Sequence, residues 1–73
     1  MIPNQFDPRW RDLLEGRINY NFEQLAASML ISRLQRQVKS GKQRPGEAIE
    51  EAIAFFNKHA TLCERDLNAI FPS

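Results

Sequence analysis

Residues 47–71 read EAIEEAIAFFNKHATLCERDLNAIF, a run of 25 positions without glycine or proline. Its apolar side chains alternate between spacings of four and three residues: Ile49, Ile53, Phe56, Ala60, Cys63, Leu67 and Ile70. This heptad pattern is typical of one buried face of an α-helix. Thr61 and Glu64 have the form of a capping box and would favour a separate second helix. Because the phase of the pattern continues through them, we predict a single helix over about 46–71 that ends at Pro72.

A second long helix is predicted immediately before this one, over about 21–40. Asn21 and Gln24 stand in the relation of a capping box, and Gly41 follows the last periodic residue. Apolar residues recur every four positions, and others flank them on both sides: Phe22, Leu25, Ala26, Ala27, Met29, Leu30, Ile31, Leu34 and Val38. A helix that is apolar over so much of its circumference is expected to contact two neighbours.

A shorter helix is predicted over about 8–15. Asp7 is suited to the N-cap position, Pro8 to the first helical position and Gly16 to the C-terminal end. Residues 1–6 show no periodicity and contain Pro3, so we expect an extended N-terminal arm. The prediction is therefore an all-α protein with a single domain over 1–73, in which a helical hairpin carries a short N-terminal helix.

The hairpin is expected to dimerise. Two layers of helix leave apolar flanks uncovered, and two hairpins stacked about a two-fold axis bury such flanks in a four-helix bundle. The alternatives are a three-helix monomer, in which the short helix covers the hairpin, and a heterodimer with a different chain. The side chains expected at the homodimer interface are Ala27, Leu30, Ile31, Leu34, Phe55 and Phe56.

Length and composition restrict the class of protein. A chain of 73 residues has room for one domain, and its single cysteine, Cys63, excludes an internal disulfide. The N-terminus lacks the basic start and apolar run of a signal peptide, so we expect a cytoplasmic protein. No apolar run is long enough to cross a bilayer, so no membrane partner is expected.

Few residues are suited to catalysis or metal binding. His59 and Cys63 are one helical turn apart, but Cys63 lies in the heptad pattern and is expected to be buried and inert. A metal site would need His59, Cys63 and Asp66 from two chains, so we favour a structural role for His59 and Cys63 and expect neither a cofactor nor enzymatic activity. The acidic residues at the start of the last helix are explained by the helix dipole: Glu47, Glu50 and Glu51.

Charge is divided unevenly along the chain. Residues 1–44 contain eight Lys or Arg and four Asp or Glu, whereas residues 45–73 contain two and five. The basic segment 33–44 contains no acidic residue, and its cations are Arg33, Arg36, Lys39, Lys42 and Arg44. Cations at a helix C-terminus are favoured by the dipole and can pair with the acidic start of the next helix. Instead of this structural role, the cations could serve one of two functions: recognition of a protein or recognition of phosphate groups.

Aromatic residues cluster before the hairpin, where they are either core residues or part of a binding surface. The partner-binding candidates are Phe6, Trp10, Arg11, Tyr20, Arg36, Lys39 and Lys42. We predict a small adaptor or regulatory protein that acts through protein–protein contacts as a homodimer. The alternative is a small nucleic-acid-binding regulator that uses the basic segment 33–44.

Overall fold

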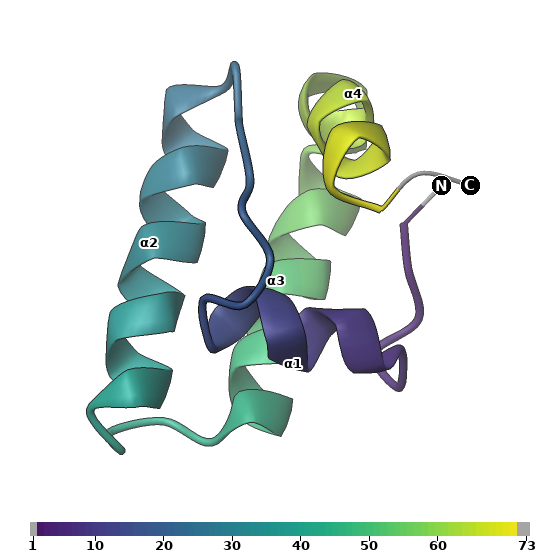
Figure 1. The fold of residues 1–73 in the computed structure, drawn as a ribbon. Coiled ribbons are helices and arrows are strands. Elements are labelled where there is room, and N and C mark those ends of the chain that lie inside the picture. The colour runs from purple at the N-terminus through teal and green to yellow at the C-terminus, as the bar shows by residue number, and fades with distance from the viewer. Residues whose placement is uncertain (1, 72–73) are drawn as a thin grey trace.

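The computed structural model describes residues 2–71 and contains four α-helices over that range. They are α1 (Pro8–Leu14), α2 (Leu25–Lys39), α3 (Pro45–Lys58) and α4 (Ala60–Ile70). No strand occurs among these residues, which confirms the all-α prediction. Figure 1 shows α2 and α3 as an antiparallel hairpin, with α1 crossing α3 and ending beside α2, and α4 turning away beyond the end of α3. The predicted stop at Pro72 and the first residue of the arm lie outside the described residues.

α1 forms for the local reasons that its sequence indicates. The Asp7 side chain accepts a hydrogen bond from the Arg9 backbone N–H at 2.9 Å, and Pro8 occupies the first turn. Gly16 follows the helix with φ of 80°, a conformation that side chains with a Cβ rarely adopt. The arm before α1 is not fully extended, because the Asn4 carbonyl accepts from the Asp7 N–H at 2.9 Å and closes a turn.

α2 begins four residues later than predicted. Gln24 is the N-cap residue, and no side chain of its own segment caps the helix. Residues 21–24 stay outside the helix because Phe22 packs toward Phe56 in the core, with ring centroids 6.2 Å apart. The Glu23 N–H donates instead to Asp66 Oδ1 of α4 at 2.9 Å. The capping box predicted at Asn21 is therefore wrong, because Asn21 lies outside the helix and the N-cap residue Gln24 makes no side-chain capping hydrogen bond.

The prediction of one helix over 46–71 is also wrong. The chain turns at His59, which has φ of −118° and ψ of 34° and separates α3 from α4. The heptad pattern continues because both helices bury residues against the same core, but Ala60 at the junction is exposed. A periodic pattern reports which face of a helix is buried and carries no information about a change in the direction of its axis.

One hydrophobic core joins the described helices. Trp10 lies at its centre without any exposed surface. Its ring stacks on that of Phe56 at 6.0 Å between centroids and is tilted against that of Phe71 at 4.8 Å. Such aromatic pairs stabilise a fold beyond the area they bury. The buried apolar residues of the core are Trp10, Leu13, Leu14, Ala27, Leu30, Ile31, Leu34, Ala48, Ile49, Ala52, Phe56, Cys63, Leu67, Ile70 and Phe71.

The core already contains most side chains predicted for the dimer interface. Of those six residues, only Phe55 is part-exposed, and the other five are buried within one chain: Ala27, Leu30, Ile31, Leu34 and Phe56. α1 packs on both hairpin helices, as the predicted alternative of a covered hairpin requires. Most of the apolar flank that motivated the homodimer is thus buried within one chain.

Candidate functional site

The structure removes Trp10 from the candidate binding residues. Its ring is buried between α1, α3 and Phe71, so it is not accessible to another molecule. Tyr20 is half-buried: its ring packs 5.0 Å from that of Phe22, and its hydroxyl shares a hydrogen bond with the Ser32 hydroxyl. Both aromatic residues therefore serve the fold.

The Lys39 side chain also lies against another part of the chain, the turn at Gly16. A Cβ at Gly16 would come within 2.7 Å of Lys39 Nζ, so the lysine side chain crosses the turn that follows α1. Gln35, one turn earlier on α2, donates from Nε2 to the Leu13 carbonyl at 2.8 Å. Two polar side chains of α2 thus lie at the C-terminal end of α1, where the helix leaves carbonyls unsatisfied and favours cations.

Phe6 and Arg11 are accessible and lie together. The Phe6 side chain is 81% exposed. Both residues line a shallow groove of about 280 Å³ where the start of α1 meets the start of α3, near Pro45 and Ile49. The fold therefore brings Phe6 and Arg11 of the predicted site together, but the other two aromatic candidates, Trp10 and Tyr20, do not line this groove.

A second exposed surface runs along α2 and was only partly predicted. We call it the α2 surface, and define it as Leu25, Ala26, Met29, Ser32, Arg33 and Arg36. Its central row is Leu25, Met29, Ser32 and Arg36, which are spaced by four, three and four residues and therefore share one helix face. Leu25 and Met29 are 74% and 62% exposed, although both are large and apolar. The wide apolar arc of α2 is thus not completely covered by its neighbours.

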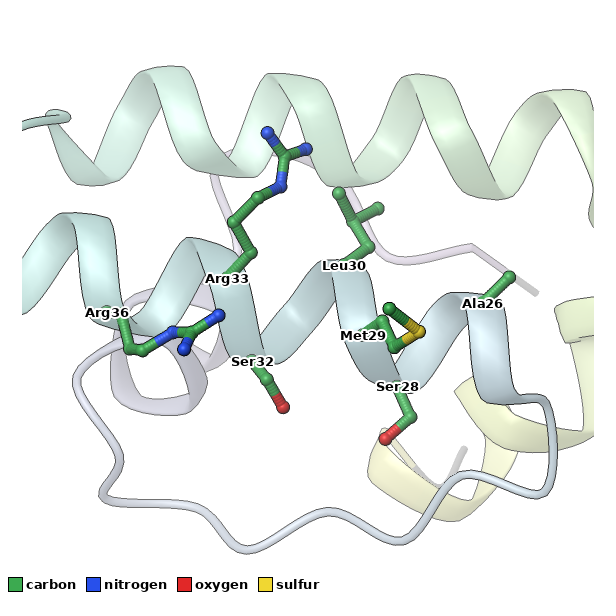
Figure 2. A pocket seen from close by; sticks show the side chains of 7 residues that line it. All are labelled: Ala26, Ser28, Met29, Leu30, Ser32, Arg33 and Arg36. Atoms are coloured by element: carbon green, nitrogen blue, oxygen red, sulfur yellow. The ribbon is translucent and has the colours of Figure 1, made fainter.

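The α2 surface is hollowed between its apolar and basic ends. Figure 2 shows Met29 and Arg36 at the two sides of an open groove of about 410 Å³, with Ser32 and Arg33 between them. A second groove of about 360 Å³ adjoins it, because Arg33 and Arg36 line both, and it extends to Lys42. Together the two grooves are continuous from the apolar Met29 to the cations Arg36 and Lys42.

The cations that line the two grooves are mostly available for binding. Arg33 forms an ion pair with Glu51 of α3 at 3.4 Å, and both side chains are about half exposed. Within the described part of the chain, Arg36 and Lys42 belong to no ion pair. The predicted pairing of charges across the hairpin turn is therefore limited to Arg33 over these residues.

Cys63 lies where the sequence places it, in the core. Burial raises the pKa of its thiol, and the carboxylate of Asp66 adds to the increase. His59 is at the junction of α3 and α4, and its ring packs 4.7 Å from that of Phe55. No group of three His, Cys, Asp or Glu side chains suited to a metal ion occurs in residues 2–71. The structure offers neither an activated thiol nor a set of metal ligands over this range.

Asp66 is a buried polar residue that the sequence did not identify as structural. Only 2% of the residue is exposed, and it joins α4 to the segment before α2 through the Glu23 N–H. Arg65 supports the same junction with an exposed ion pair to Glu23 at 3.1 Å. An acidic residue next to the heptad pattern is the available signal in the sequence, but its partner is 43 residues away.

No helix in the described range is long and apolar enough to span a membrane. Comparisons with family models, with curated proteins and with solved structures produced no match to this chain.

Proposed function

We propose that this chain is a small non-enzymatic adaptor or regulatory protein that binds another protein through the α2 surface. The observation that carries the proposal is the exposure of Leu25 and Met29 in line with Arg36. Exposed large apolar residues next to a groove are a common feature of protein-binding surfaces, and methionine adapts its shape to a partner. Arginine is enriched at such interfaces.

A nucleic-acid-binding regulator is the second candidate. It is supported by the groove lined by Arg33, Arg36 and Lys42, because phosphate contacts use Arg and Lys side chains. A phosphate backbone along these cations would leave Leu25 and Met29 in water, whereas a protein partner would bury them. The apolar half of the surface therefore favours a protein.

The homodimer stays a prediction of the sequence, and this proposal does not depend on it. Most of the apolar residues that motivated it are buried within one chain, whereas Leu25 and Met29 of the apolar arc stay exposed. A second copy of the chain remains one of the outcomes that the following experiment distinguishes.

The test is affinity purification from native lysate after nuclease treatment, with tagged wild type, Met29→Lys and Leu62→Lys. Leu62 is an exposed apolar residue on α4, 57% accessible, so Leu62→Lys makes the same change away from the α2 surface. We expect the amount of partner protein recovered with Met29→Lys to be at least tenfold lower than with wild type or Leu62→Lys. Equal recovery by all three variants would contradict the proposal. Loss of every partner on nuclease treatment would favour the nucleic-acid candidate, and recovery of the untagged chain alone would indicate self-association.

A further inference from the structure

The α2 surface also indicates what kind of segment it binds. We infer that the partner contributes an amphipathic helix with carboxylates in its N-terminal half and apolar side chains in its C-terminal half. This inference rests on the proposed function and adds to it the chemistry and direction of the bound segment.

The apolar end of the surface is suited to a helix. Leu25 and Met29 are one turn apart on the same face of α2, about 6 Å along the axis. Side chains spaced by three or four residues on a partner helix would contact both of them, which is the usual way in which an amphipathic helix binds a groove. Leu30 lines the same groove and is almost completely buried, so the hollow has an apolar wall.

The basic end of the surface is suited to carboxylates. Arg36 lies about 10 Å from Met29 along the axis, a distance of two helical turns. Its guanidinium has no ion-pair partner among the described residues, and Lys42 in the adjoining groove has none either. Arginine binds carboxylates through two parallel hydrogen bonds, which gives both strength and direction. The exposed pair of Arg33 with Glu51 is worth little, so a partner carboxylate can replace it.

The direction of the partner follows from helix electrostatics. The N-terminal end of a helix carries partial positive charge and favours acidic side chains in its first turn. A partner whose carboxylates reach Arg36 and Lys42, near the C-terminal end of α2, therefore places its N-terminus there. Its apolar C-terminal half then covers Met29 and Leu25, so the partner runs antiparallel to α2.

A second copy of the α2 surface does not meet these requirements. In a parallel arrangement the two copies of Arg36 would lie opposite each other, and like charges at an interface are unfavourable. In an antiparallel arrangement each Arg36 would lie opposite the partner copy's Leu25 end, and a guanidinium would be desolvated without a carboxylate. The surface itself contains no acidic residue that could pair with these cations.

The experiment is selection of displayed random peptides, about four helical turns long, on immobilised wild-type protein. Enriched peptides are then synthesised, and their affinities are measured by fluorescence anisotropy for wild type and for four variants. The two test variants are Met29→Lys and Arg36→Glu. The controls are Leu62→Lys and Lys58→Glu, which make the same changes at exposed positions on other helices.

We expect enriched peptides to carry Asp or Glu in the N-terminal half and apolar residues at helical spacing in the C-terminal half. Affinity should fall at least tenfold for each test variant and less than twofold for each control. Enriched peptides without excess carboxylates, with the reverse order, or with equal affinity for Arg36→Glu would overturn the inference, as would a selection without enrichment. Partners from lysate that depend on Met29 would still support the proposed function in each of these cases.

Discussion

Cys63 shows how the fold determines the chemistry of a single residue. The thiolate is the reactive form of cysteine, and low-pKa cysteines are found near cations or helix N-termini in partly exposed places. Here the thiol is buried, and the neighbouring charge is the carboxylate of Asp66, so both effects raise the thiol pKa. The side chain therefore acts as a small apolar residue of the core.

We predict that Cys63 is protected from alkylation in the folded protein. Because its pKa is raised above the ordinary value of 9.0, the thiolate fraction at about pH 8 is smaller than in the unfolded chain. The reaction with iodoacetamide should be at least tenfold slower than in concentrated urea. Equal alkylation rates in buffer and in urea would contradict the prediction.

The raised pKa also makes stability depend on pH, because the folded state favours the protonated thiol. The stabilisation from the protonated thiol is complete below the unfolded pKa and is lost as the pH rises through the folded pKa.

The exposed residues of the α2 surface show what sequence reasoning identifies at this scale. Arg36 and Lys42 were expected at a binding surface, and both are exposed. Leu25 and Met29 were recognised only as part of a wide apolar arc. A periodic pattern gives the width of such an arc, but which part of it stays uncovered depends on where the neighbouring helices pack.

At the scale of elements, α4 is joined to the segment before α2 by a hydrogen bond between residues far apart in the chain. Helix N-termini leave backbone N–H groups unsatisfied, and the nearby Asn21 and Gln24 supply no side-chain acceptor to α2. Asp66 accepts from the Glu23 N–H just before that helix. A contact across the molecule thus fixes the residue before the N-cap, and no local capping box forms.

We predict that Asp66→Ala destabilises the protein by about 1–3 kcal/mol, because it leaves the Glu23 N–H without its acceptor. Asp66→Asn should lose less than half as much, since its side-chain oxygen can still accept that hydrogen bond. Urea unfolding followed by circular dichroism gives the two free energies, and amide exchange at Glu23 reports the contact directly. A loss for Asp66→Asn as large as that for Asp66→Ala would show that the contact does not depend on a hydrogen bond at this position.

At the scale of the whole molecule, the short α1 completes the core. Its three apolar residues are fully buried, and Trp10 joins the rings of Phe56 and Phe71. A chain of this size has only one core, which supplies about 3–5 kcal/mol of stability. The helix that is shortest in sequence therefore contributes a large share of the buried aromatic surface.

We predict that Trp10→Ala unfolds most of the protein. Truncation of a buried tryptophan costs about 3–5 kcal/mol, which is as much as the whole core is expected to provide. Far-UV circular dichroism should show a large loss of helix. Arg11→Ala, an exposed change on the same helix, should alter stability by no more than about 0.5 kcal/mol. A Trp10→Ala protein with native helix content would contradict this prediction.

The sequence by itself determined the features that depend on neighbouring residues. Asp7 and Pro8 begin α1, Gly16 and Gly41 follow helices with positive φ, and apolar periodicity indicates the buried faces. These signals act over one or two helical turns, so they can be read without the rest of the chain.

Only the tertiary structure decided the turn at His59, the late start of α2 and the covering of the hairpin by α1. Each depends on contacts between residues far apart in sequence, such as Glu23 with Asp66. The exposed Leu25 and Met29 belong to the same class, because an apolar side chain stays accessible only where no other helix packs on it. Local pattern specifies what a helix can bury, and long-range packing determines what it does bury.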